Sequence, residues 1–330
     1  MLLRDADAAD LPAVADFFER LGVAFPDANL EQFVRPSHGA WAVGSRLVLG
    51  EDGGLQGLLG YLDRPLRLGG TACSSRWPVN FFLAPELRGR GLGKELMAGV
   101  MAQADLGLVL GGNRYSIPVL ERTGWRRLGH LKTYSWAGAP PSGCGLGSAA
   151  VVAGLPPATP WVEARPSCCG VPRTVDLPAK AFGGALRPLH RVFHRLDGDA
   201  VTGFFVLSAR SGETRPGETR PKVTLVDFES VPGREAELVA AALDTASTFG
   251  GEIEAHACRD DMCAAFEAAR PRRAATGLPV WILDPEQRVD VTGGLGPWHV
   301  TFGDHDRYRQ WPDSVTLCAS SDELTRPSPF

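Results

Sequence analysis

The sequence predicts an α+β protein made of two units with the same architecture, each a mixed, mainly antiparallel sheet flanked by helices. The order strand, strand, strand, helix, strand, helix, strand is indicated twice, at a separation of about 150 residues. A stretch rich in Gly, Pro, Ala and Ser separates the two runs, as expected of a linker. The 330 residues suit two domains, and 44% hydrophobic with 22% charged residues is ordinary for a globular protein.

The first unit is predicted to span residues 1–137. Its first strand is expected at Met1–Arg4, and the spacing of apolar residues predicts a helix over Asp7–Gly22. Further strands are expected at Ala40–Leu49, Leu55–Leu62, Trp77–Leu83, Leu106–Leu110, Arg126–His130 and Lys132–Trp136, and further helices at Asn29–Val34, Gly91–Ala104 and Tyr115–Arg122.

The second unit is predicted to span residues 167–330, after a linker over residues 138–166. Its strands are expected at Arg191–Arg195, Val201–Ser208, Lys222–Glu229, Glu252–Ala257, Val280–Leu283 and Trp298–Phe302, and its helices at Gly233–Phe249 and Asp260–Arg270. A duplicated Gly-Glu-Thr-Arg-Pro sequence at residues 212–221 is polar and rich in breakers, which predicts a surface loop without function.

Composition, charge and cysteine spacing favour a soluble cytoplasmic protein. The net charge of −4 excludes a strongly basic nucleic-acid binder. Charged residues directly after Met1 argue against a signal peptide, and five prolines in the longest uncharged run argue against a membrane span. Seven irregularly spaced cysteines indicate a reducing compartment. The excess of Arg over Lys is typical of a GC-rich bacterium. A homodimer is possible from the sequence.

The most specific motif joins an apolar strand to a helix through a basic, glycine-rich turn. The strand ends at Phe81, Phe82 and Leu83, and the turn with the helix start contains Arg88, Gly89, Arg90, Gly91, Leu92, Gly93 and Lys94. Glycines allow a ligand to approach the backbone closely, and a helix N-terminus carries partial positive charge. The motif therefore predicts a binding site for a pyrophosphate.

Two other phosphate-binding loops do not fit this turn. A nucleoside-triphosphate P-loop requires a Gly-Lys-Ser/Thr ending, which the turn lacks. The dinucleotide pattern requires Gly-x-Gly-x-x-Gly, whereas this turn contains Arg-x-x-Gly-x-Gly after the third major strand of its unit.

The turn from Arg88 to Gly93 resembles the acyl-CoA-binding motif of the GCN5-related N-acetyltransferases. The sequence Asn113, Ser116 and Glu121-Arg122-Thr123-Gly124-Trp125 is similar to that family's Asn…Tyr-Glu-Lys-x-Gly-Phe ending, so the resemblance covers residues 1 to 136. The corresponding turn of the second unit, residues 230–234, has lost the glycine pattern. The whole chain therefore resembles tandem members of the family, with a degenerate second copy of the fold.

The resemblance implies direct transfer of an acetyl or other short acyl group from acyl-CoA to the amine of a small molecule. It implies that the turn from Arg88 to Lys94 holds the CoA pyrophosphate, with Asn113 and Ser116 nearby. The backbone of Phe81, Phe82 and Leu83 would pair with the pantetheine arm, and an amide near Leu83 would stabilise the oxyanion. Acetyl-CoA is the implied donor, and no metal is implied.

Two departures from the family pattern concern proton transfer. The family's usual general acid is a Tyr, and Leu120 occupies its position here. Tyr115, five residues earlier and on a different helical face, is the candidate substitute. No carboxylate lies on the strand Trp77–Leu83, so His38 is the candidate base. Trp77, Phe81 and Phe82 could line an acyl pocket, although bulky residues on a central strand are first expected to form core.

Other polar groups give weaker predictions. Asp227 and Glu229, or Gly303–Asp306, could hold a cationic acceptor, although Asp227 is more simply explained by pairing within the fold. The pairs His190/His194 and Cys258/Cys263 lack further ligands for a metal, and Cys168-Cys169 lacks a histidine partner for a nucleophile. The alternative to an enzyme is a non-catalytic acyl-CoA-binding protein or a scaffold on the same fold.

Overall fold

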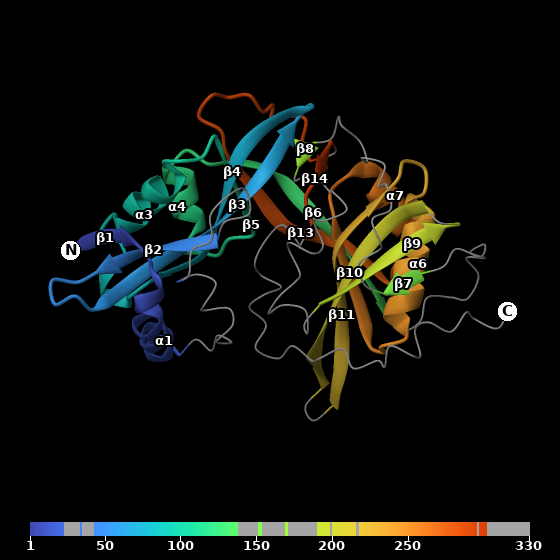
Figure 1. Cartoon of the computed structure of the whole chain (residues 1–330), viewed down its shortest axis with the longest axis horizontal. Coiled ribbons are helices and arrows are strands. Elements are labelled where there is room, and N and C mark those ends of the chain that lie inside the picture. Colours follow the sequence, from blue (N-terminus) through green and yellow to red (C-terminus); the bar gives the residue numbers. More distant parts are fainter. Residues whose placement is uncertain are drawn as a thin grey trace.

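The computed structural model describes residues 1–22, 34, 43–137, 151–153, 169–170, 190–198, 200–215, 218–295 and 297–301. These residues form a mixed, mostly antiparallel sheet with helices packed against it, which confirms the predicted α+β class (Figure 1). The predicted helix Asn29–Val34 lies outside the described residues except for Val34, and so does His38.

The first segment of the chain follows the predicted order of elements. Asp7 begins the first helical turn, because its side chain accepts a hydrogen bond from the Ala9 amide and Asp10 accepts one from the Asp7 amide. The elements are β1 (Leu2–Asp5), the 3₁₀ turn η1 (Ala8–Asp10), α1 (Leu11–Arg20), β2 (Val43–Leu49), β3 (Leu55–Leu68), β4 (Thr71–Leu83), the 3₁₀ turn η2 (Pro85–Leu87), α3 (Leu92–Met101), β5 (Leu106–Leu110), α4 (Ile117–Arg122) and β6 (Arg126–Ala137).

The second segment repeats the run of three strands, helix, strand, helix and strand. Its elements are β7 (Val151–Ala153), β8 (Cys169–Gly170), β9 (His190–Asp197), β10 (Ala200–Arg215), β11 (Glu218–Ser230), α6 (Glu235–Ser247), β12 (Glu252–Ala257), α7 (Asp260–Ala268), β13 (Arg273–Leu283) and β14 (Trp298–His299).

Strands from the two segments interleave in one sheet. The order is β1-β2-β3-β4-β5-β13-β6-β12-β11-β10-β9-β7, while β8 links β14 to β3. Strand β13 pairs with β5 through Val280–Leu110 and with β6 through Ala274–Tyr134. Strand β6 in turn pairs with β12 through Ala255–Tyr134. Strand β13 of the second segment therefore lies between β5 and β6 of the first, and β6 lies between β13 and β12 of the second. The predicted domain boundaries at residues 137 and 167 stay a prediction.

Several predicted elements differ from the structure, among them the strand expected at Val280–Leu283, which begins at Arg273 as β13. The strands expected at Arg126–His130 and Lys132–Trp136 are one strand, β6. Strands β3 and β4 extend well past Leu62 and before Trp77, because Arg76 pairs with Asp63 across the two strands. The duplicated sequence forms the ends of β10 and β11, where the two copies pair with each other. The prediction of a loop there was therefore wrong.

Helices α1 and α3 lie on opposite faces of the first segment's strands. Phe81 of β4 points toward α3, because a Cβ on Gly93 would lie 2.9 Å from the Phe81 ring. Phe82, the next residue, packs edge-on against Phe18 of α1 with ring centroids 5.0 Å apart. Successive side chains of a strand point to opposite faces. The site region of β4 is therefore fixed from both sides.

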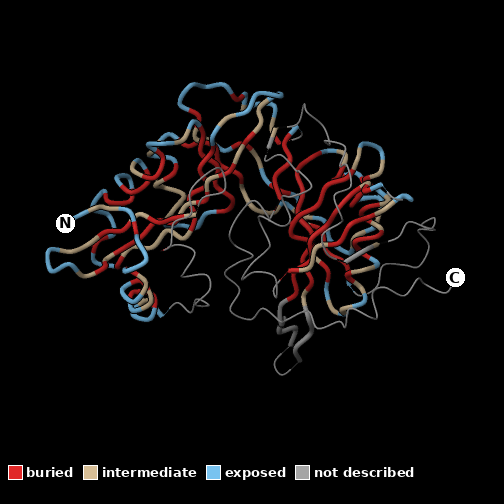
Figure 2. The backbone as a smooth tube through the Cα atoms, in the orientation of Figure 1, coloured by how far each residue is buried: buried red, intermediate tan, exposed pale blue. Residues whose placement is uncertain are grey.

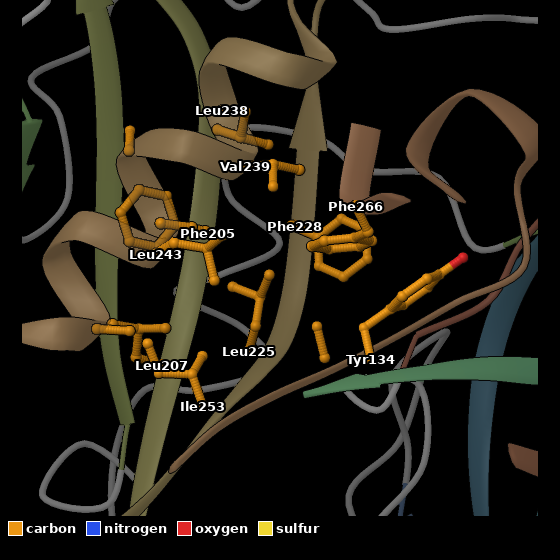
Figure 3. Close-up of a cluster of buried hydrophobic side chains, with 14 of the residues drawn as sticks. Tyr134, Phe205, Leu207, Leu225, Phe228, Leu238, Val239, Leu243, Ile253 and Phe266 are labelled. Atoms are coloured by element: carbon orange, nitrogen blue, oxygen red, sulfur yellow. The ribbon is translucent and has the colours of Figure 1, made fainter. Parts of the chain in front are cut away.

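Buried residues lie in both segments of the chain (Figure 2). The apolar ones form three clusters. One lies under α6 and α7 in the second segment and includes Phe205, Phe228 and Phe266 (Figure 3). A second lies around α1, α3 and α4. The third joins β3, β4, β5, β6 and β13 to Trp298 and Val300. This third cluster connects the last described residues of the chain to the first segment.

Candidate active site

Strands β4 and β5 pair through only two residues of each, in the middle of β4 and at the start of β5. Their parallel pairing joins Ser75 to Leu106 and Arg76 to Gly107. Beyond Arg76, β4 continues to Leu83 with β3 as its only partner among the described strands. We call this place the β4/β5 junction. No described strand pairs with this part of β4 on the β5 side, and an extended ligand can add to such an edge as a further hydrogen-bonded chain.

A bulge in β4 lies at this edge. Leu59 of β3 pairs with Phe81 and Gly60 pairs with Val79, so Asn80 is the extra residue. Asn80 has a φ of 52°, which is unusual for a residue other than glycine. Bulges bend a strand and redirect its side chains, and they are common beside binding sites.

The glycine-rich turn leaves backbone amides without acceptors at the start of α3. Gly89 and Gly91 have φ values of 82° and 87°, and a Cβ on either would meet nothing within 4 Å. The Arg88 and Arg90 amides donate to Pro85 O and Leu87 O. In contrast, the following four amides have no acceptor in the part of the chain that the structure describes: Gly89, Gly91, Leu92 and Gly93. Unpaired amides at a helix N-terminus form an anion-binding site.

Gly93 has a different reason to be glycine. It is buried, and a Cβ there would lie 2.9 Å from Phe81 Cζ and 3.3 Å from Val119 Cγ2. Gly93 therefore allows α3 to pack closely on β4 and α4, whereas Gly89 and Gly91 keep the approach to the amides open.

Exposed basic side chains surround the turn. Arg88, Arg90 and Lys94 are all exposed, and Arg88 Nε donates to Leu83 O over 3.3 Å. The Arg88 guanidinium lies 5.3 Å from the centre of the Tyr115 ring, and Arg114 lies 4.7 Å from it. Arg114 also donates to Tyr115 Oη. Tyr115 is 56% exposed, so the structure brings it to the outer end of β4.

Asn113 and Ser116 fix the loop that leads into α4. Asn113 Oδ1 accepts hydrogen bonds from the amides of Tyr115 and Ser116, and Ser116 Oγ accepts one from the Asn113 amide. Both side chains are exposed or half-buried beside the turn. The structure therefore shows these two predicted site residues in a reciprocal capping arrangement.

Leu120, which stands where the family's Tyr is expected, is part of the apolar core. It is 1% exposed and packs in the cluster around α3 and α4. No hydroxyl is therefore presented from that position. His38, the candidate base, lies outside the described residues.

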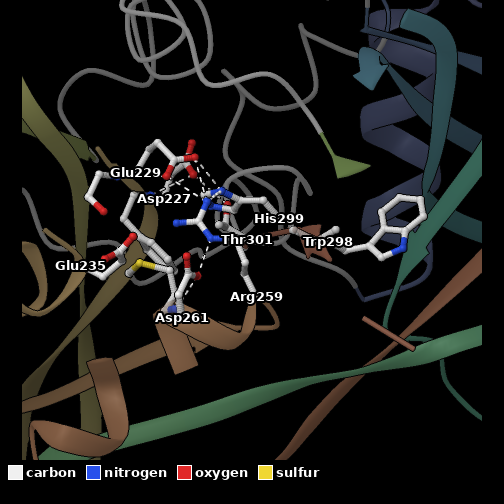
Figure 4. Close-up of polar contacts among 12 residues, drawn as sticks. Asp227, Glu229, Glu235, Arg259, Asp261, Trp298, His299 and Thr301 are labelled. Atoms are coloured by element: carbon white, nitrogen blue, oxygen red, sulfur yellow. Dashed lines mark hydrogen bonds and ion pairs between the residues drawn. The ribbon is translucent and has the colours of Figure 1, made fainter. Parts of the chain in front are cut away.

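The corresponding place in the second segment has a different structure. Strands β11 and β12 pair in parallel from Lys222–Glu252 to Leu225–Ala255 and then stop, and we call this place the β11/β12 junction. Glu229, near the end of β11, accepts two hydrogen bonds from Arg259 Nη1, at 2.9 and 3.1 Å. Glu229 Oε2 also lies 2.8 Å from His299 Nδ1 (Figure 4). All three side chains are about 95% buried or more.

The last described residues close this junction. Thr301 Oγ1 donates to Asp227 Oδ1 over 2.9 Å, and Cys258 Sγ donates to Trp298 O over 3.0 Å. Asp227 thus pairs within the fold, as the simpler sequence interpretation expected. Burial alone would raise the pKa of Glu229, but His299 and Arg259 lower it to about 2. Glu229 is therefore a charged partner of internal groups and unsuited to hold an acceptor.

Sequence analysis missed Arg259 and His299, because nothing in their local pattern separates them from surface residues. A polar chain on strands β11 and β12 was also not predicted. Lys222 Nζ lies 2.6 Å from Glu254 Oε2, and Glu254 Oε1 lies 3.1 Å from His256 Nε2. Burial would raise the pKa of Glu254, but His256 and Lys222 lower it to about 2.

The described part of the chain contains no group of three or more His, Cys, Asp or Glu side chains arranged to hold a metal ion. Cys168 and Gly303–Asp306, two of the weaker candidates, lie outside it. Among its helices, none has the length and apolar character needed to cross a membrane.

Solved structures of acetyltransferases share this fold. A GCN5-related N-acetyltransferase from Anabaena variabilis matches with a TM-score of 0.60 and 10% identity, over 86% of this chain and 73% of that one. A conserved Enterococcus faecalis protein of unknown function, described as a probable N-acyltransferase, matches with a TM-score of 0.58 and 12% identity, over 85% and 72%.

A GCN5-related N-acetyltransferase from Kribbella flavida matches with a TM-score of 0.56 and 14% identity, over 85% of this chain and 70% of that one. No protein-family model and no curated protein matches the sequence. The chain has the fold of the GCN5-related N-acetyltransferases.

Proposed function

We propose that this protein transfers a short acyl group, such as acetyl, from acyl-CoA to the amine of a small molecule. The observation that carries the proposal is the combination at the β4/β5 junction: four amides without described acceptors at the start of α3, next to a stretch of β4 that no described strand pairs with on the β5 side. A pyrophosphate attached to a long polar arm fits both features at once.

The residues of the turn would hold the donor. The amides of Gly89, Gly91, Leu92 and Gly93 would bind the pyrophosphate, and Arg88, Arg90 and Lys94 would supply positive charge around it. The pantetheine arm would then run along the β4 edge at Phe81, Phe82 and Leu83. Asn113 and Ser116 would act through the loop that they fix beside this path.

Transfer would proceed by direct attack of a neutral amine on the thioester carbonyl. The C–N bond forms, an oxyanion develops and is stabilised by a backbone amide of β4, and the C–S bond then breaks to release CoA thiolate. Holding both substrates in one site would supply most of the rate acceleration. His38 would accept the amine proton, and Tyr115 would donate a proton to the leaving thiolate.

The second candidate is a protein that binds acyl-CoA without transferring the acyl group. The buried position of Leu120 favours it, since the helix presents no hydroxyl there. The two candidates differ in turnover, because only an enzyme releases free CoA thiol in response to an amine.

The test is thiol release from acetyl-CoA in the presence of an amino sugar, an amino-acid derivative or a polyamine. An enzyme would release thiol at a rate that depends on one of these amines. Replacing Tyr115 with Phe would lower kcat by on the order of 100-fold if Tyr115 is the proton donor. Binding of acetyl-CoA without amine-dependent release would support the non-catalytic candidate.

A further inference from the structure

The closed end of the β4/β5 junction lies where the acyl group of a bound donor would arrive. The turn that would bind the pyrophosphate follows the far end of β4, beyond Leu83. A donor arm running along β4 from that end leads back toward Ser75 and Arg76, where β4 and β5 begin to pair. The thioester would therefore point toward this closed end, and its acyl chain would extend farther into it.

The side chain next to the closed end is Trp77. Arg76 points toward α3, because its Nη1 donates to Val100 O near the end of that helix. Trp77 therefore points to the opposite face, where it is 0% exposed in one cluster with Leu106 and Leu108 of β5. Its indole Nε1 donates to Ser75 Oγ over 2.9 Å, and Ser75 Oγ donates to Arg64 O. These bonds hold the ring in one orientation.

A second tryptophan supports this cluster from the other end of the chain. Trp298 is 2% exposed and belongs to the same cluster as Trp77. Its amide donates to Leu295 O over 2.8 Å, and its carbonyl accepts from Cys258 Sγ. Its ring points away from the polar side chains of the β11/β12 junction, whereas the next residue, His299, joins them (Figure 4).

We propose that Trp77, supported by Trp298, limits the acyl group of the donor to acetyl or propionyl. The inference rests on the proposed function, since it concerns the donor of that reaction. A close-packed interior accommodates an added methylene only by displacing its neighbours. Trp77 cannot turn aside without breaking its bond to Ser75, and Trp298 occupies part of the same interior. A longer acyl chain therefore meets a filled apolar wall.

The experiment is calorimetric titration of the full chain with acetyl-, propionyl-, butyryl- and hexanoyl-CoA. The wild type is expected to bind the two short donors and to bind hexanoyl-CoA at least tenfold more weakly than acetyl-CoA. Trp77→Phe and Trp298→Leu each remove side-chain volume from the cluster. Each methylene that gains an apolar surrounding strengthens binding about fourfold, so the ratio of hexanoyl- to acetyl-CoA affinity is expected to rise by tenfold or more.

Trp136→Leu is the matched control. Trp136 is 3% exposed in the separate cluster under α6 and α7, so its replacement leaves the ratio unchanged while it also costs core packing. Trp298→Leu keeps the test available if Trp77→Phe does not fold.

Equal affinity of the wild type for hexanoyl- and acetyl-CoA would overturn the inference. So would an unchanged ratio in folded Trp77 and Trp298 variants that still bind acetyl-CoA. In both cases the proposed function survives. Failure of the folded wild type to bind any acyl-CoA would instead remove the proposed function, and this inference with it.

Discussion

The two parallel strand pairs β4/β5 and β11/β12 stand at the same step of the repeated order of elements, but their junctions differ. In the first, β4 runs from Arg76 to Leu83 without a described partner on the β5 side, beside backbone amides that have no described acceptor. In the second, the space past Leu225 and Ala255 contains a buried ion cluster and the chain segment from Trp298 to Thr301. The described protein fills the second junction, whereas the first leaves a β4 edge and backbone amides for the donor that we propose.

This difference shows how one architecture can serve two purposes. Strand divergence breaks backbone pairing, and each exposed group must then be satisfied by a ligand, by water or by the protein. At the first junction, the proposed acyl-CoA donor would take that role. The second assigns it to Glu229, Arg259 and His299, which also fix the segment that carries Trp298. The filled junction therefore stabilises the fold and supports the open one.

The largest expected effect comes from breaking the ion cluster of the β11/β12 junction. Glu229→Gln would leave the buried Arg259 guanidinium without its full counter-charge, which costs about 3–5 kcal/mol of unfolding free energy. Urea unfolding followed by circular dichroism measures this loss. Lys132→Gln, which removes a half-exposed ion pair with Glu267, is the control and is expected to shift the midpoint little. Similar shifts for both variants would mean that the cluster does not hold the junction.

Acidification should produce the next largest effect. The pKa of Glu229 is lower in the folded protein than in the unfolded chain, where a Glu titrates near about 4.3. Below that pH the unfolded chain binds more protons, so this contribution to stability falls as the pH decreases from about 5 toward 2.

The stability difference between wild type and Glu229→Gln should therefore narrow over this range, in urea unfolding at pH 7, 4 and 3. A difference that stays constant from pH 7 to pH 3 would show that Glu229 is not held in its charged form.

Smaller effects on stability and on acetyl-CoA binding are expected when Gly93 and Gly89 of the β4/β5 junction are replaced. Gly93→Ala should cost about 1–3 kcal/mol of stability, because its Cβ would collide with the ring of Phe81. Gly89→Ala should cost only about 1 kcal/mol, from its left-handed backbone, while weakening acetyl-CoA binding by about tenfold or more. Unfolding curves and calorimetric titration of both variants check this. Equal stability losses with unchanged binding in Gly89→Ala would contradict the assigned roles.

Local patterns predicted most elements of the fold and the open junction. The apolar strand before Arg88, the glycines and the helix after them are all signals within a short stretch of sequence. The predicted strands ended at Leu62 and resumed at Trp77, because the ion pair between Asp63 and Arg76 that accompanies the longer β3 and β4 forms only in the folded chain.

The placement of β13 between β5 and β6 and the ion cluster of the β11/β12 junction could not be predicted either, because both depend on contacts between distant parts of the chain. The apolar residues of β13 indicate a strand but not its neighbours, and β13 finds β5 and β6 more than a hundred residues earlier in the chain. Glu229, Arg259 and His299 come from three distant places. Only the loss of glycines at residues 230–234 indicated that the second junction differs from the first.

The most direct test of this comparison is calorimetric titration of the full chain with acetyl-CoA, in the wild type and in Gly91→Glu and Gly233→Glu. The two glycines form a matched pair, since they have φ values of 87° and 84° and open space where a Cβ would lie. The wild type is expected to bind one equivalent, Gly91→Glu to lose binding, and Gly233→Glu to bind as the wild type does. Two equivalents, or loss of binding in Gly233→Glu alone, would contradict the assignment of one open and one filled junction.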